Sequence, residues 1–141
     1  MNIAIDFDGT CVSHDYPRIG KEIGAVPVLK KLIAAGHQLI LFTMRGDPQY
    51  KYDGVHGNAE PYNYLTAAVL WFEFHEIPLW AVNTNPMQHH WTNSPKAFAD
   101  LYIDDAALGC PLVEFEFDPP YADWHAIELM LIAKGILPSG D

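Results

Sequence analysis

Short hydrophobic runs alternate along the chain with longer segments in which apolar residues recur every three or four positions. The first pattern is typical of buried strands, and the second is typical of helices with one apolar face. An alternating segment at 112–117 predicts a further edge strand. The predicted strands cover residues 2–7, 38–43, 79–82 and 101–104, and the predicted helices cover residues 25–35, 62–75, 95–99 and 121–134.

This alternation predicts an α/β fold in one domain over residues 1–141. Parallel neighbouring strands need crossover connections, which are usually helices, so we expect a Rossmann-like parallel sheet in a three-layer sandwich with helices on both faces. In such folds ligands bind beyond the carboxyl ends of the strands. The residues that directly follow each predicted strand are therefore the first candidates for a functional site.

Two aspartates end the first predicted strand, in the sequence Asp-Phe-Asp-Gly-Thr from Asp6 to Thr10. Because side chains at positions i and i+2 of a strand share one face, Asp6 and Asp8 are expected to lie close together. Two charges about 4 Å apart at an effective dielectric near 20 repel by roughly 4 kcal/mol. A bound cation removes this penalty, and Mg²⁺ prefers oxygen ligands. The alternative is a purely structural role, in which Asp-Gly forms only a turn.

Three further segments carry polar residues at comparable places. Thr43 ends the run at 38–43, and a second acidic pair, Asp104 and Asp105, follows the run at 101–104. Lys96 lies in the predicted helix at 95–99, where Ser94 could act as the cap and Pro95 as the first helical residue. Taken singly, the threonine could satisfy local backbone groups and the lysine could be an ordinary surface residue.

In this order and spacing, the two acid pairs, the threonine and the lysine resemble the four-motif signature of the haloacid dehalogenase superfamily of phosphohydrolases. The resemblance implies a Mg²⁺-dependent phosphatase. Asp6 would be the nucleophile that forms an aspartyl-phosphate, and Asp8 would be the general acid and then the base. Thr43 and the backbone N–H of Met44 would bind phosphoryl oxygens, and Lys96 would neutralise Asp6 and the transferring group.

The same resemblance implies the metal ligands. One oxygen of Asp6, the backbone carbonyl of Asp8 and one acid of the second pair would hold Mg²⁺. Asp105 is favoured as the direct ligand, with Asp104 orienting it or Lys96. The reverse assignment stays open.

The gaps between the motifs are too short for the inserted cap domain that many relatives carry, so the chain is expected to be capless. What remains for specificity is mostly the long loop at 46–63, whose aromatic residues could stack on a base or a sugar or could simply pack on themselves. Arg45 stands two residues after Thr43 and could bind a second anionic group of the substrate or form an ordinary salt bridge.

Composition and charge limit the classes of partner that the protein is expected to bind. The formal net charge is −10 with eight lysines and arginines in total, which disfavours tight binding of nucleic acid. No apolar run reaches the length of a membrane span and no secretory signal is evident, so a cytoplasmic protein is expected. The apolar helix over 65–75 could face a second subunit in a homo-oligomer. Adjacent His89 and His90 lack zinc-ligand spacing.

The sequence therefore favours a phosphatase of a small phosphorylated metabolite, such as a sugar phosphate or a nucleotide. Two alternatives remain. An open site could also admit a polynucleotide end or a phosphoprotein, although the acidic composition argues against this. A catalytically idle phosphate-binding or interaction module on the same fold is the other alternative.

Overall fold

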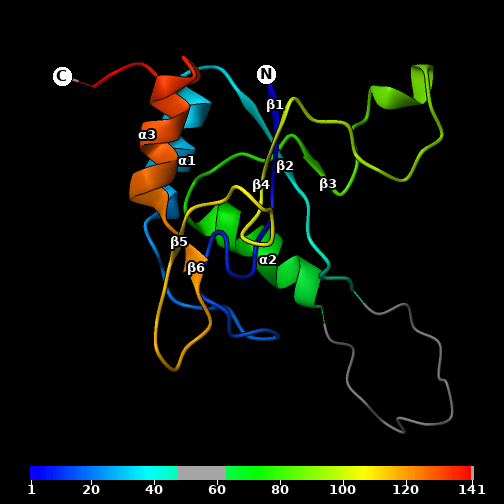
Figure 1. Cartoon of the computed structure of the whole chain (residues 1–141). Coiled ribbons are helices and arrows are strands. Elements are labelled where there is room, and N and C mark those ends of the chain that lie inside the picture. The colour runs from blue at the N-terminus through cyan, green and yellow to red at the C-terminus, as the bar shows by residue number, and fades with distance from the viewer. Residues whose placement is uncertain (48–62, 141) are drawn as a thin grey trace, which may run out of the picture.

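The computed structural model of the chain describes residues 1–47 and 63–140. Four parallel strands form the central sheet in the order β3-β2-β1-β4 (Figure 1). Ala4 in the middle of β1 lies opposite Ile40 on one side and Tyr102 on the other. The strands are β1 Asn2–Ile5, β2 Gln38–Leu41, β3 Ala81–Val82 and β4 Leu101–Ile103. All four predicted strands of the sheet are thus confirmed, each slightly shorter than predicted.

Among the described residues, three α-helices pack against this sheet and build a shared core. They are α1 Ala25–Ala34, α2 Tyr64–Phe74 and α3 Trp124–Ala133. Ile3 and Ile5 of β1 join a single buried cluster with Leu29, Phe72 and Leu131, one from each helix. Figure 1 shows α1 and α3 side by side, and an ion pair of 2.7 Å between Lys31 and Glu128 joins them.

The segment between β3 and β4, residues 83–100, is mostly irregular, and its only helical part among the described residues is the turn η1 Gln88–His90. The predicted helix over 95–99 is wrong. The side-chain amide of the buried Gln88 donates to the carbonyls of Ser94 and Lys96, and its oxygen accepts from the N–H of Phe98. These backbone groups are therefore bound to a distant side chain instead of to a helical turn.

The predicted edge strand over 112–117 does not extend the main sheet. Only β5 Leu112–Val113 forms, and it pairs antiparallel with β6 Tyr121–Ala122 in a separate hairpin. Because residues 121–122 form β6, α3 begins later than predicted, at Trp124. The carboxylate of Asp123 accepts from the N–H of Ala126 and caps the helix.

Asp47 caps helix α2 from a distance in sequence. Its carboxylate accepts from the backbone N–H groups of Leu65 and Thr66, which have no partner within the helix. Apart from residues 46–47 and 63, the loop predicted to carry specificity lies outside the described residues.

The parallel sheet with its helices confirms the predicted Rossmann-like α/β fold, and no cap module stands among the residues that the structure describes. None of the described helices has the length and apolar character that a membrane crossing requires.

The turn after β1 is held from the C-terminal part of the chain. The N–H of Ala122 donates to the carbonyl of Gly9, and the indole N–H of the buried Trp124 donates to the carbonyl of Thr10 at 2.6 Å. The hairpin and α3 thus fix the segment that carries both aspartates of the first motif.

Replacing Trp124 by Phe should lower the free energy of unfolding by about 1 to 3 kcal/mol, because a buried carbonyl loses its donor. Urea denaturation of the variant and the wild type measures this difference. Trp91→Phe is the matched control, since Trp91 is 59% exposed and its replacement should change stability by about 0.5 kcal/mol at most. Equal effects at both positions would contradict a bracing role for Trp124.

Candidate metal and phosphate site

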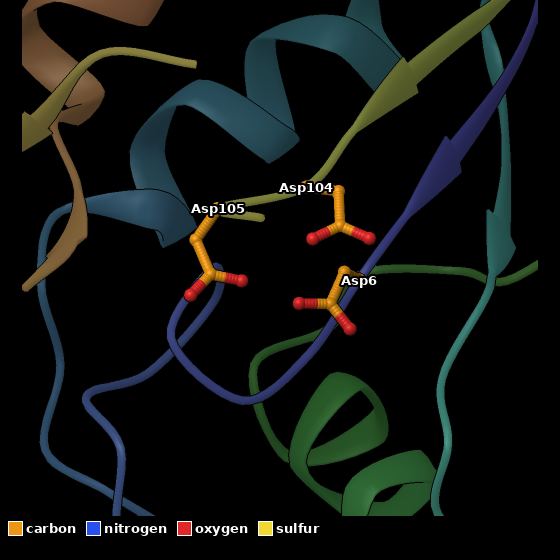
Figure 2. Close-up of side chains that lie close together, drawn as sticks. All are labelled: Asp6, Asp104 and Asp105. Atoms are coloured by element: carbon orange, nitrogen blue, oxygen red, sulfur yellow. The ribbon is translucent and has the colours of Figure 1, made fainter. Parts of the chain in front are cut away.

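Three carboxylates meet at the carboxyl edge of the sheet. Asp6 follows β1, and Asp104 and Asp105 follow the neighbouring strand β4. One ligand atom from each residue lies within 4.8 Å of the others, and Figure 2 shows the three carboxylates turned toward one another. A group of carboxylate oxygens at this spacing is the donor set that a hard divalent cation takes. The three residues could therefore hold a metal ion.

Thr10 links the two acid motifs. Its hydroxyl donates to Asp6 Oδ2 at 2.8 Å and accepts from the backbone N–H of Asp105 at 2.9 Å. Asp105 Oδ1 lies farther from the same hydroxyl, at 3.2 Å. A hydroxyl has only one proton to donate, and the shorter distance indicates that Asp6 accepts it. In the sequence, Thr10 was recognisable only as part of the first motif, because its link to Asp105 depends on the pairing of β1 with β4.

The surroundings of Asp6 oppose its ionisation. Burial raises the pKa of Asp6 from 3.8 to about 7; the hydrogen bond from Thr10 works in the opposite direction, and the negative charge of Asp104 adds to the rise. Within the described residues, no lysine or arginine forms an ion pair with Asp6. The edge is therefore a place of excess negative charge that a cation would relieve.

His14 contacts the acid cluster from the segment that follows the first motif, a contact that the sequence did not predict. Its Nε2 atom lies 2.8 Å from Asp105 Oδ2. The pair passes directly over Gly9, where an added Cβ would collide with both side chains, and Gly9 has a φ of +80°. Glycine is therefore required here for two reasons, the left-handed backbone and the close approach. The sequence predicted a turn at Gly9, but it did not predict that the side chain of His14 lies against this glycine.

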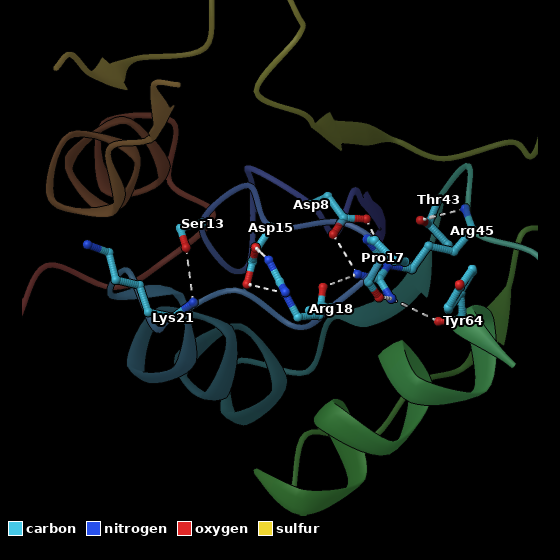
Figure 3. A network of polar contacts seen from close by, with 9 residues as sticks. All are labelled: Asp8, Ser13, Asp15, Pro17, Arg18, Lys21, Thr43, Arg45 and Tyr64. Carbon is cyan, nitrogen blue, oxygen red and sulfur yellow. Dashed lines mark hydrogen bonds and ion pairs between the residues drawn. The ribbon is translucent and has the colours of Figure 1, made fainter. Parts of the chain in front are cut away.

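Asp8 lies apart from this cluster, in a bidentate ion pair with Arg45. Arg45 Nε donates to Asp8 Oδ2 at 2.8 Å and Nη2 donates to Oδ1 at 2.7 Å (Figure 3). Of the two alternatives for Arg45, the structure shows the salt bridge. The expectation that Asp6 and Asp8 share one strand face is not met, because β1 ends at Ile5 and both aspartates lie in the segment after it. The carboxylate of Asp8 pairs with Arg45 and is not part of the acid cluster.

The remaining predicted site residues, Thr43, Met44 and Lys96, differ in their contacts and exposure. The N–H of Thr43 donates to Asn83 Oδ1 at 2.8 Å, and its hydroxyl accepts from the N–H of Arg45 at 3.1 Å. The side chain of Met44 is fully exposed. The ammonium of the exposed Lys96 lies over the ring of Tyr102, 5.4 Å from its centroid. The described contacts of Lys96 thus include a cation–π contact and no ion pair with Asp6.

No protein-family model and no curated protein matches this chain. A solved structure does match, that of a conserved protein coded by a locus of Bacteroides thetaiotaomicron, with 37% sequence identity and a TM-score of 0.68. The match covers 95% of this chain and 91% of that one. The chain belongs to the family of this conserved protein. The likeness establishes a shared fold over nearly the whole length of both proteins and assigns no reaction.

The raised pKa of Asp6 predicts a pH dependence of stability in metal-free protein. Between pH 4 and pH 7 the folded state keeps the proton that the unfolded state has already lost, so stability falls as the pH rises through this window. Asp6→Asn removes this titration. The variant should therefore gain stability relative to the wild type on going from pH 4 to pH 8, as measured by urea denaturation in EDTA.

Asp47→Asn provides a control of opposite sign. Hydrogen bonds from the side chain and backbone of Thr66 lower the pKa of Asp47, so its contribution to stability is present at neutral pH and is lost in acid. The Asp47 variant should lose stability relative to the wild type at pH 8 and recover toward it in acid. A difference between Asp6→Asn and the wild type that stays constant with pH would contradict the assignment for Asp6.

Proposed function

We propose that this protein is a Mg²⁺-dependent phosphatase of the haloacid dehalogenase superfamily that hydrolyses the phosphate monoester of a small metabolite, such as a sugar phosphate or a nucleotide. The observation that carries the proposal is the meeting of Asp6, Asp104 and Asp105 at the carboxyl edge of a parallel sheet. The order of the four motifs along the chain supports the same assignment, and so does the capless fold.

In this proposal the reaction has two steps. A carboxylate oxygen of Asp6 attacks phosphorus, the bond from phosphorus to the ester oxygen breaks, and Asp8 gives its proton to the departing oxygen. Asp8 then takes a proton from water, whose oxygen attacks the aspartyl-phosphate and releases inorganic phosphate and free Asp6. Thr43 and the N–H of Met44 bind phosphoryl oxygens, and Lys96 turns from Tyr102 toward the transferring group.

Asp6, the backbone carbonyl of Asp8 and an acid of the Asp104–Asp105 pair would hold the metal. When bound, Mg²⁺ would offset the repulsion among these carboxylates and neutralise negative charge on the phosphoryl group. The cluster of excess negative charge and the raised pKa of Asp6 both support this role.

Small substrates are favoured over large polyanions on electrostatic grounds. The formal net charge of the chain is −10, and Arg45, one of its two arginines, is buried against Asp8. Few cations remain to follow a nucleic-acid backbone, and phosphate contacts dominate such binding. A polynucleotide end or a phosphoprotein is therefore the weaker substrate class.

A catalytically idle phosphate-binding module is the second candidate function, and one observation favours it. Both oxygens of Asp8 accept hydrogen bonds from Arg45, an ion pair that a purely structural role for Asp8 would also explain. Turnover decides between the two candidates.

The wild type should hydrolyse p-nitrophenyl phosphate in the presence of Mg²⁺, and Asp6→Asn should abolish turnover, because the variant has no nucleophile. Release of p-nitrophenol measures both. Asp118→Asn is a matched control, since Asp118 is exposed in the β5–β6 loop, and it should retain the wild-type rate. Wild-type turnover no higher than that of Asp6→Asn would favour the idle module.

Mg²⁺ should also raise the melting temperature. A ligand at 100 times its dissociation constant stabilises the native state by about 2.7 kcal/mol, or roughly 5 to 10 °C for a domain of this size. Differential scanning calorimetry with and without Mg²⁺ measures the shift. We expect Asp105→Asn to lose most of it and Asp118→Asn to keep it. A full shift in Asp105→Asn, with loss in Asp104→Asn, would instead make Asp104 the direct ligand.

A further inference from the structure

Arg45 is a buried cation with an unusually complete set of partners. Its side chain is almost wholly buried, and its guanidinium lies 5.0 Å from the ring centroid of Phe7 and 5.2 Å from that of Tyr16. A charge in such a place is costly unless hydrogen bonds and an opposite charge compensate it. Asp8 supplies the charge, and three backbone carbonyls supply further acceptors.

Every N–H of the guanidinium is accounted for. Two N–H groups go to Asp8, as described above. Nη1 donates to the carbonyls of Pro17 and Tyr64, each at 3.1 Å, and the second N–H of Nη2 donates to the carbonyl of Arg18 at 2.7 Å. A guanidinium has five N–H groups, and these contacts use all five. Arg45 therefore has no donor left for an anionic group of a substrate.

The carbonyls of Pro17 and Arg18 belong to a segment that we call the flap, residues 13–22. The base of the flap is closed by two hydrogen bonds of 3.0 Å between Ser13 and Lys21. Arg45 holds its tip, and the same flap brings His14 to Asp105. One side chain thus connects the proposed general acid, the flap and the start of α2, as Figure 3 shows.

We propose that Arg45 is a positioning residue that fixes the carboxylate of Asp8, and with it the flap, for proton transfer to the leaving group. The proposal rests on the proposed phosphatase function. Arg45 itself does not touch the substrate. Each oxygen of Asp8 accepts one N–H of Arg45 and has a second lone pair, which remains available for the transferred proton. Because all five N–H groups of the guanidinium are held, the carboxylate has one defined place.

Arg45→Lys tests this role, because lysine keeps the charge but cannot reproduce the two parallel bonds to Asp8. The variant should lose about 10- to 100-fold in kcat, with KM little changed, as is typical when a supporting contact to a reacting group is lost. The loss should be larger with an alkyl phosphate than with p-nitrophenyl phosphate, whose leaving group needs little protonation. In an Asp8→Asn background the same replacement should cost little more.

Arg18→Lys is the matched control. It changes the other arginine of the chain, whose exposed side chain pairs with Asp15, and it should leave kcat and the dependence on the leaving group unchanged. Tyr16→Leu covers the outcome that Arg45→Lys fails to fold. Tyr16 is 58% exposed, and its removal takes one ring from the guanidinium without touching the core. This variant should shift the leaving-group dependence in the same direction by a smaller factor.

The outcomes separate this inference from the proposed function. A wild type without turnover of any phosphate ester overturns both. An active wild type whose Arg45→Lys variant loses equally with both substrates, or loses as much in the Asp8→Asn background, overturns the positioning role alone. If Arg45→Lys does not fold, an unchanged leaving-group dependence in Tyr16→Leu overturns it as well.

Discussion

The mutual repulsion of three carboxylates on one half-buried edge is the constraint around which this molecule is organised. The parallel pairing of β1 with β4 makes it unavoidable, because both strands end at the same edge and each is followed by aspartate. A hydrogen bond from Thr10 to Asp6 and a contact from His14 to Asp105 offset part of this repulsion. Burial, together with the negative charge of Asp104, raises the pKa of Asp6. An edge in this state is suited to a cation.

The nearby ion pair of Arg45 and Asp8 differs from the acid cluster because its charges are of opposite sign. Arg45 and Asp8 compensate each other fully, and the remaining donors of the arginine are taken by backbone carbonyls. The two groups divide the carboxylates of the first motif, since no lysine or arginine of the described residues pairs with Asp6, while Asp8 pairs with Arg45. This division matches the two roles proposed for them, a nucleophile beside a metal and an acid kept in place.

Packing from the far end of the chain keeps both groups where they are. The hairpin β5–β6 and helix α3 bind the carbonyls of the turn after β1 through Ala122 and Trp124. Residues more than 100 positions apart thus determine the path of the segment that carries Asp6 and Asp8. The site is in this sense a product of the whole domain, although its residues follow individual strands.

The sequence by itself determined the parallel α/β fold, the positions of its main strands and the meeting of Asp6 with Asp104 and Asp105, because hydrophobic periodicity and the geometry of parallel strands are properties of local sequence. It did not determine what depends on contacts between distant side chains. A helix was expected at 95–99 because Ser94 and Pro95 are typical of a helix start. In the structure, however, the side-chain amide of Gln88 binds the backbone carbonyls of Ser94 and Lys96. The partners of Arg45 and His14 were equally beyond local reasoning. A long polar side chain can reach many groups, and only the folded backbone decides which of them lies within hydrogen-bond distance.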